Sequence, residues 1–165
     1  VDILFVGRLT QQKGIDNLVE ILKKIKHTIS SFNVHIVGIG ELQSLLLNEL
    51  DKHGIKYTYE YKCNDMVALY NRARVTILTS YYEGYPNVLV ESIACGTPVV
   101  SFDCESGPSE IIDNEINGFL IPRFGIDFFT SKVAYILSSD FQINAELVNN
   151  DYKDKLINVI NSSYY

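Results

Sequence analysis

Hydrophobic residues follow two alternating patterns along the chain. Short apolar runs bounded by Gly or Pro are typical of strands, and apolar residues that recur every three or four positions are typical of helices. The first pattern predicts strands at 1–6, 34–37, 56–61, 75–78, 98–102 and 119–121. The second predicts helices that start at 14, 41, 65, 88 and 127, and a further helix at 144–160.

This order of elements predicts the fold class. Strands that alternate with helices form βαβ units and a mostly parallel sheet. We therefore predict an α/β fold, a doubly wound, mostly parallel sheet with helices on both faces, and one domain over residues 1–165. Ligands of such sheets bind outside the carboxyl ends of the strands. The loops to search for a site are 7–13, 38–41, 61–65, 79–87 and 103–109.

Composition and charge narrow the classes of protein. Hydrophobic residues make up 47% and charged residues 21% of the chain, which is typical of a globular protein and unlike a disordered one. With 14 basic and 20 acidic residues, the net charge is −6. Nucleic-acid binders depend on clustered Lys and Arg, so we expect no nucleic-acid partner. A local basic site for one small anion remains compatible with this charge.

Cysteine usage and the absence of a long apolar run point to a cytoplasmic location. Cys63, Cys95 and Cys104 lie far apart in no metal-binding spacing, so we expect reduced thiols. The sequence has no transmembrane segment, and its start lacks the basic region of a signal peptide. Because the chain opens directly on a strand, we expect it to be a piece of a longer protein.

The loop after the first predicted strand carries candidate anion-binding groups. Gly7, Arg8, Lys13 and Gly14 lie between a strand end and a helix start. Glycines let a ligand approach the backbone, a helix N-terminus favours an anion, and two cations suit a diphosphate. A solvated loop with ordinary surface charges remains the alternative. The glycines of Gly38-Ile39-Gly40 similarly suit either a ligand or a tight turn.

The segment SYYEGYPNVLVE at 80–91 is the most informative loop. Glu83 follows a strand, and Glu91 lies eight residues later within an apolar helical stretch. A buried ionised carboxylate needs a hydrogen-bonding or charged partner, so Glu91 must find a partner or face solvent. Pro86 suits the first turn of a helix, whose free N–H groups would point toward the ligand. A position on the solvent face of the helix remains the alternative for Glu91.

Other catalytic arrangements find little support. The three histidines are scattered, and no Ser/His/Asp or Cys/His arrangement can be built from them. We expect His27 at the surface and His35 packed in the sheet or at its rim. No Asp-x-Asp pair or carboxylate cluster suggests a divalent cation, so we expect neither a metal site nor a cofactor.

Several motifs occur in an order that resembles a known family. These are FVGRL-x3-KG at 5–14, ILTSYYEGYPNVLVESIACGTPVV at 77–100, GPSEII at 107–112 and NGFLIP at 117–122. Together they resemble the carboxyl-terminal domain of retaining glycosyltransferases of family 4, which have the two-domain GT-B fold. The resemblance spans roughly residues 3 to 140. GPSEII is similar to the corresponding segment of enzymes that build bacterial surface polysaccharides.

The resemblance implies a role for each motif. It implies that Arg8 and Lys13 contact the diphosphate of a nucleotide-sugar donor and stabilise the leaving group, and that Glu83 meets the sugar hydroxyls. It implies that Glu91 accepts hydrogen bonds from the ribose. The catalytic residues are then Arg8, Lys13 and Glu83. The expected donor-binding residues are Gly7, Arg8, Lys13, Tyr61, Lys62, Glu83, Gly84, Tyr85, Asn87, Val88 and Glu91.

The same resemblance implies a larger enzyme. Sugar transfer with retention, without a metal and from a UDP-sugar as the commonest donor, would need an amino-terminal acceptor domain that this chain lacks. An acceptor glycan or lipid-linked glycan would bind there, with the enzyme in the cytoplasm or peripheral at the inner face of the membrane. Two alternatives remain, a sugar-nucleotide epimerase of similar fold and a non-catalytic nucleotide-binding or interaction module.

Overall fold

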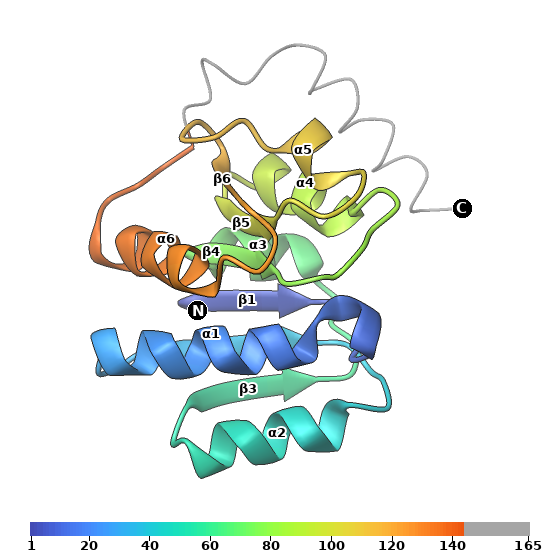
Figure 1. The fold of residues 1–165 in the computed structure, drawn as a ribbon, viewed down its shortest axis with the longest axis vertical. Coiled ribbons are helices and arrows are strands. Elements are labelled where there is room, and N and C mark those ends of the chain that lie inside the picture. The colour runs from blue at the N-terminus through green and yellow to red at the C-terminus, as the bar shows by residue number, and fades with distance from the viewer. Residues whose placement is uncertain (144–165) are drawn as a thin grey trace.

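The computed structural model describes residues 1–143, and these form one six-stranded sheet (Figure 1). All strand pairs are parallel, and the strand order is β3-β2-β1-β4-β5-β6. The strands are β1 Ile3–Val6, β2 Asn33–Val37, β3 Lys56–Glu60, β4 Val75–Leu78, β5 Val99–Phe102 and β6 Gly118–Ile121. The helices are α1 Ile15–Thr28, α2 Gln43–Lys52, α3 Met66–Arg72, α4 Asn87–Ala94, α5 Pro108–Ile111 and α6 Ile126–Ser138, with a 3-10 turn at Gln11–Lys13.

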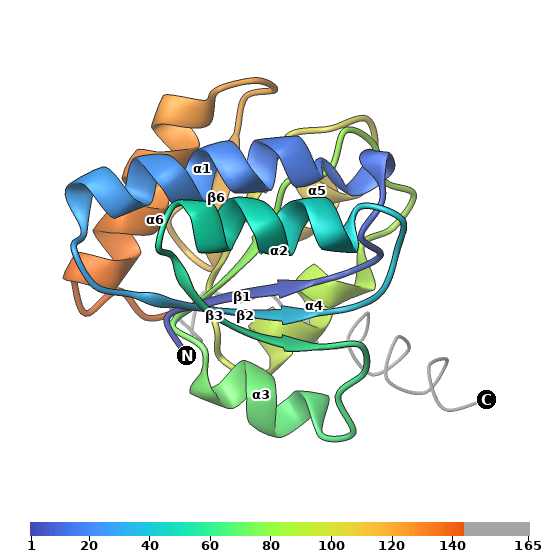
Figure 2. The same cartoon turned by 90° about the horizontal axis from the view of Figure 1, so that it is seen from below.

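Helices cover both faces of the sheet. Figure 2 shows α1 and α2 on one face and α3 on the opposite face. Successive strand residues point to opposite faces, so Ile3 and Phe5 pack in the large cluster with α1, α2 and α6. Leu4, between them, packs with Leu69 and Tyr70 of α3. Burial on both sides explains why the central strand β1 is a continuous apolar run rather than an alternating one.

The strand order places a switch point between β1 and β4. The chain builds outward from β1 to β3, then returns to the other side of β1 and builds outward to β6. Loops leave in opposite directions from the carboxyl ends of β1 and β4, which is where ligands of doubly wound sheets bind. In Figure 1 the arrows of β1 and β3 point right, so the loops that carry the candidate residues lie on that side.

The predicted fold class and strands are confirmed, with local corrections. All six predicted strands are present, and their bounds shift by at most two residues. Helix α3 begins one residue after Asp65, whose side chain caps it by accepting a hydrogen bond from the Ala68 N–H at 2.9 Å. The short helix α5 and the 3-10 turn at Gln11–Lys13 were not predicted. The helix expected at 144–160 lies outside the described residues.

Candidate functional site

Close backbone contacts fix the first loop against its neighbours. Gly14 adopts φ of 62°, and a Cβ there would collide with the carbonyl oxygen of Thr79 at the end of β4. A Cβ on Gly38 would collide with the carbonyl oxygen of Gly7. These glycines therefore allow three loops to touch through their backbones. For Gly38, this favours the tight-turn interpretation over a ligand-binding one.

Lys13 and Glu83 form an ion pair between the two loops at the switch point. Lys13 Nζ lies 2.6 Å from Glu83 Oε1, and the residues are 70 positions apart in sequence. Their side chains are 13% and 7% exposed. The hydroxyl of Ser80 donates a second hydrogen bond to Glu83 Oε1 at 2.6 Å. The fold thus brings together a cation and a carboxylate that the sequence analysis assigned to one site, and holds both with little exposure.

Gln12, a neutral residue, links Arg8 to the loop that carries Glu83. Its Nη2 donates to Gln12 Oε1 at 2.7 Å. The amide nitrogen of Gln12 donates in turn to the carbonyl oxygen of Tyr82 at 3.1 Å. The backbone continues this link, since the N–H of Tyr81 donates to the carbonyl oxygen of Gln12 at 2.9 Å. Arg8 itself is exposed at the carboxyl edge of the sheet.

The loop that precedes α5 contacts the backbone of the loop that carries Glu83. The Ser106 hydroxyl donates to the carbonyl oxygen of Glu83 at 2.9 Å. Gly107, with φ of 90°, lies so close that a Cβ would come within 2.7 Å of the Gly84 carbonyl oxygen. The motif GPSEII thereby packs against the loop that carries the carboxylate.

Helix α4 directs free backbone N–H groups toward this edge. Its first residues are Asn87 and Val88, whose N–H groups have no hydrogen-bond acceptor within residues 1–143. Pro86, buried and just before the helix, provides no side-chain cap. Unpaired N–H groups and the helix dipole together favour a negatively charged ligand at this end.

Glu91 is half-buried and shares a hydrogen bond. Its Oε2 accepts from the hydroxyl of Tyr70 at 2.9 Å. Burial raises the pKa of the Glu91 carboxyl above its ordinary value of 4.5, and the Tyr70 hydrogen bond opposes that rise. Burial, and then the nearby Glu91 carboxylate, raise the pKa of Tyr70, so this phenol remains a donor. Glu91 therefore does not lie on a fully solvent-exposed helix face, and its partner is a phenol rather than a cation.

The remaining candidate residues are exposed and make fewer contacts. Tyr61 and Lys62 follow β3 at the outer edge of the sheet, and Tyr61 is 71% exposed. Two strands separate β3 from β4, so these residues lie farther from the switch point than Arg8 and Lys13 do. Tyr85 is 41% exposed, and burial followed by the charge of Glu110 raises the pKa of its hydroxyl. All of them nevertheless belong to loops at the same carboxyl edge.

Four residues of the site escaped the sequence analysis. Tyr70 and Ser106 reach the predicted residues over 21 and 23 positions of sequence, so spacing does not reveal them. Gln12 and Ser80 are local partners, four and three positions from Arg8 and Glu83. Only Gln12 stands within a motif loop between two predicted ligand-binding residues, which is a usable signal. The four are Gln12, Tyr70, Ser80 and Ser106.

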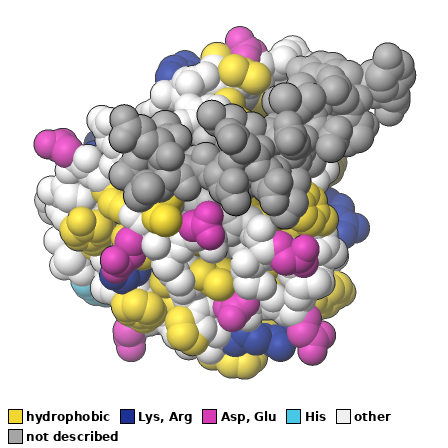
Figure 3. Space-filling model, turned by 90° about the horizontal axis from the view of Figure 1, so that it is seen from above, with side chains coloured by type: hydrophobic (Ala, Val, Ile, Leu, Met, Phe, Trp, Pro, Cys, Tyr) yellow, Lys and Arg dark blue, Asp and Glu magenta, His cyan; other side chains and the backbone are white. Residues whose placement is uncertain are grey.

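Outside the switch point, the described residues form neither a metal-ligand cluster nor a membrane-spanning helix. Within residues 1–143, no three His, Cys, Asp or Glu side chains lie together as metal ligands would. No helix in that range is long and apolar enough to cross a membrane. The described part of the face in Figure 3 carries acidic, basic and hydrophobic side chains interspersed. His27 is exposed and His35 is buried beside Glu60, as predicted.

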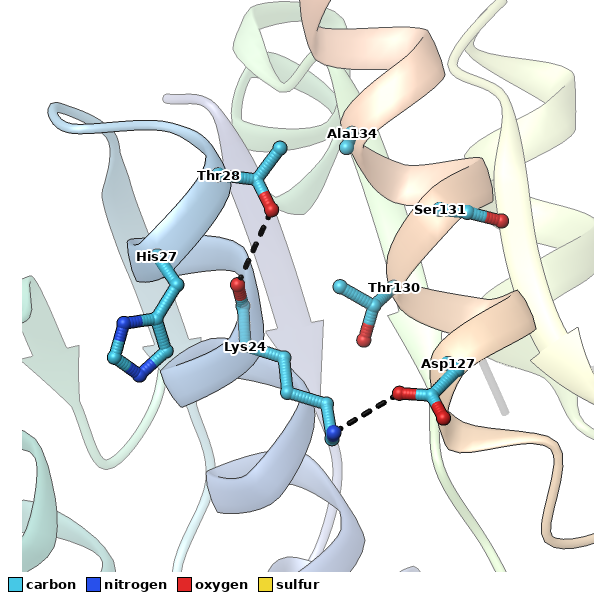
Figure 4. Close-up of a pocket in the computed structure, with 7 residues that line it drawn as sticks. All are labelled: Lys24, His27, Thr28, Asp127, Thr130, Ser131 and Ala134. Carbon is cyan, nitrogen blue, oxygen red and sulfur yellow. Dashed lines mark hydrogen bonds and ion pairs between the residues drawn. The ribbon is translucent and has the colours of Figure 1, made fainter.

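A hollow of about 580 Å³ lies away from the switch point, between α1 and α6 (Figure 4). In it, Lys24 Nζ of α1 lies 2.9 Å from Asp127 Oδ1 of α6. The side chains are 38% and 90% exposed, far more than Lys13 and Glu83. The hydrogen bond and charge of Asp127 raise the pKa of Lys24. None of the candidate site residues lines this hollow, so it is not part of the site at the carboxyl edge.

Fold and site together define a class: an α/β domain with a parallel, doubly wound sheet whose switch point carries two cations, a held carboxylate and a helix N-terminus. Comparison with known proteins identifies the family. Residues 1–154 match the family described as glycosyl transferases group 1, and the chain belongs to it.

Two relatives are each about a third identical to this chain over most of its length. An amylovoran biosynthesis glycosyltransferase of Erwinia amylovora is 31% identical over 140 residues, which are 84% of this chain and 39% of that protein. An N-acetyl-D-galactosaminyltransferase of Campylobacter jejuni, named for an undecaprenol-linked acceptor, is 31% identical over 152 residues, 90% of this chain and 41% of that protein. The chain thus spans about two fifths of these relatives.

Solved structures agree on the fold. TarM of Staphylococcus aureus, solved with UDP, superposes with a TM-score of 0.80 at 22% identity, over 99% of this chain and 33% of that one. The lipopolysaccharide galactosyltransferase WaaB also gives 0.80, at 24% identity, over 99% of this chain and 49% of that one. Both are glycosyltransferases of the GT-B fold, so the predicted Rossmann-like half of such a fold is confirmed.

Proposed function

We propose that this chain is the donor-binding domain of a retaining glycosyltransferase of family 4. It binds a nucleoside diphosphate sugar, a UDP-sugar in the first instance, and presents the sugar to an acceptor glycan held by an amino-terminal domain. One observation carries the proposal: loops 70 residues apart bring Lys13 to within 2.6 Å of Glu83 at the switch point of the sheet, and Arg8 belongs to the same loop as Lys13.

The proposed chemistry needs positive charge where the diphosphate leaves. When the bond between sugar and phosphate breaks, negative charge accumulates on the diphosphate. Arg8 and Lys13 supply two cations there, and the free N–H groups of Asn87 and Val88 add the positive end of a helix dipole. These fixed groups are preorganised, so we propose that donor binding is metal-independent.

The two glutamates are proposed to contact different parts of the donor. Glu83 is held by Lys13 and Ser80 through Oε1, which leaves Oε2 for sugar hydroxyls and for developing positive charge at the anomeric carbon. Glu91 is bound by Tyr70 through Oε2, which leaves Oε1 for the ribose hydroxyls. Tyr61 and Lys62 would border the base from the outer strand.

The relatives support a role in building bacterial surface polysaccharides. One is named for amylovoran biosynthesis and another for an undecaprenol-linked acceptor. We propose an acceptor of this glycan or lipid-linked class, a cytoplasmic enzyme peripheral to the inner face of the membrane, and an acceptor domain in the part of the relatives that this chain does not span.

Isothermal titration calorimetry with UDP, GDP and their hexose derivatives tests the proposal. We expect a diphosphate to bind, and a sugar-bearing donor to bind through the same residues. Arg8→Ala should weaken UDP more than uridine, because the guanidinium contacts phosphate alone. Failure of every nucleotide to bind, or equal losses for UDP and uridine, would contradict the proposed function.

A further inference from the structure

Arg8 and Lys13 are held at the switch point in different ways. Lys13 forms an ion pair with Glu83, so part of its charge is already compensated. Arg8 has no carboxylate within ion-pairing distance among residues 1–143, and its side-chain hydrogen bond goes to the neutral amide of Gln12. The guanidinium is therefore oriented without being neutralised.

The orientation of the Gln12 amide is fixed by its two partners. A guanidinium can only donate hydrogen bonds, so the atom facing Arg8 Nη2 must be Oε1. A backbone carbonyl can only accept, so the atom facing the Tyr82 oxygen must be Nε2. Both polar ends of the side chain are thus used, one in each of the two loops that meet at the switch point.

Gln12 is also anchored through its backbone. Its carbonyl oxygen accepts from the Tyr81 N–H at 2.9 Å, one residue before the carbonyl that its side chain contacts. Tyr81 is itself held by α1, because its hydroxyl donates to the Asp16 carboxylate. That hydrogen bond is the main cause that raises the pKa of Tyr81 to about 12, so the phenol stays protonated at neutral pH.

We propose that Gln12 is a positioning residue for Arg8: it holds the guanidinium toward the diphosphate and couples it to the loop that carries Glu83. This inference rests on the proposed function, because it needs a diphosphate as the ligand of Arg8. A free arginine side chain loses rotamer entropy when it is fixed. Gln12 removes part of this cost before the ligand arrives, and its neutrality leaves the full charge of Arg8 to the phosphate.

A double-mutant cycle separates this role from a structural one. UDP and uridine affinities are measured by calorimetry for the unmodified protein, Gln12→Ala, Arg8→Ala and the double variant. We expect Gln12→Ala to weaken UDP about fivefold and to leave uridine unchanged, since one oriented hydrogen bond is worth about 1 kcal/mol. In the Arg8→Ala background, Gln12→Ala should weaken UDP less than about twofold, because the side chain it positions is gone.

Two further variants keep the test decisive. Gln12→Met retains the length of the side chain but neither polar atom, so it should weaken UDP as much as Gln12→Ala does. Gln11→Ala is the matched control, because Gln11 is exposed in the same 3-10 turn and makes no side-chain hydrogen bond within residues 1–143. It should leave UDP affinity unchanged.

The outcomes distinguish failure of this inference from failure of the proposed function. If UDP does not bind, or Arg8→Ala leaves UDP affinity unchanged, the proposed function fails and the role of Gln12 fails with it. If Arg8→Ala weakens UDP but Gln12→Ala does not, only the positioning role is overturned. The same holds if Gln12→Ala weakens UDP equally with and without Arg8, or if Met restores the affinity.

Discussion

Two lysine–carboxylate pairs of this domain differ mainly in exposure. Lys13 and Glu83 join two loops at the switch point, with side chains 13% and 7% exposed. Lys24 and Asp127 join α1 to α6 (Figure 4), with side chains 38% and 90% exposed. Coulomb attraction between groups that face water is weak and screened by salt, whereas attraction between sheltered groups is stronger.

The difference shows what each pair can do. A sheltered cation at the same sheet edge as the free N–H groups of α4 retains a strong local field, which suits binding of a small anion. In the exposed pair, each charged group can contact water instead of its partner at little cost in free energy. The pair therefore contributes little to folding or to ligand binding. Distance alone does not separate the pairs, since both are under 3 Å at 2.6 and 2.9 Å.

Removing the two lysines gives the largest contrast. Lys13→Ala should weaken UDP binding about 10- to 100-fold, the value of one charged hydrogen bond of about 1.5–3 kcal/mol. It should also lower the thermal midpoint, because Glu83 is left sheltered without its cation. Lys24→Ala is the matched control and should change neither quantity measurably. Calorimetry and thermal melts of the two variants check this, and similar effects from both lysines would contradict the comparison.

Glu91 is a third carboxylate for comparison with these pairs, because it is partly buried but its partner is the Tyr70 phenol rather than a cation. Because burial raises the pKa of Glu91, the folded state binds more protons than the unfolded state above pH 4.5. Stability from this group is therefore present at low pH and lost as pH rises through the raised pKa.

Glu91→Gln removes that titration and should raise the free energy of unfolding more at pH 8 than at pH 5. It should also weaken UDP about fivefold, through a poorer hydrogen bond to the ribose. Urea unfolding at both pH values and calorimetry measure the two effects. An equal stability change at both pH values would place Glu91 among the solvent-facing carboxylates.

Removing the carboxylate of the switch-point pair should change UDP affinity by a smaller factor than removing its lysine, and in the opposite direction. Glu83→Gln keeps the size of the side chain and frees the charge of Lys13, so UDP should bind about threefold more tightly. Binding of the sugar-bearing donor should not gain, because the carboxylate that faces the sugar is lost. Asp127→Asn serves as the control, and we expect it to leave both ligands unaffected. Weaker UDP binding to Glu83→Gln would mean that Glu83 orients Lys13 rather than compensates it.

Chelation should have no effect. Because Arg8, Lys13 and the α4 N–H groups supply the positive charge, excess EDTA should leave UDP affinity within the error of calorimetry. Addition of Mg²⁺ should likewise leave it unchanged at constant ionic strength. Loss of binding in EDTA would show that these groups do not suffice for the diphosphate.

The sequence predicted the strands better than the contacts among loops. Strand positions follow from apolar runs and their boundaries, which are local properties, and all six were found. Helix α5, with four residues, is too short to display helical periodicity and was missed. The predicted site loops do meet at one edge, because the carboxyl ends of parallel strands always share an edge.

The environments of the two glutamates depended on distant residues. Glu83 was expected in the loop after a strand, and its loop position is as expected, but its partner Lys13 is 70 positions away and could not be read from spacing. For Glu91, spacing left open whether it faced solvent or found a partner. The partner is Tyr70, 21 positions away on α3, and its contact depends on how α3 packs against α4. Such pairs are set by tertiary packing and carry no local sequence signal.

The position of α6 against α1 has a consequence for the order of assembly during synthesis. Within this domain, residues 1–60 are synthesised before the rest and contain β1, β2 and β3 with α1 and α2. Until β4 arrives, one edge of β1 has no partner, and until α6 arrives, part of α1 lacks its cover. The first half of this domain therefore exposes, while the second half is missing, an unpaired strand edge and apolar helix surface, both of which promote aggregation. The last described helix completes the layer that the first one begins, so a released chain that ends before residue 126 should depend on chaperones far more than one that ends after residue 138.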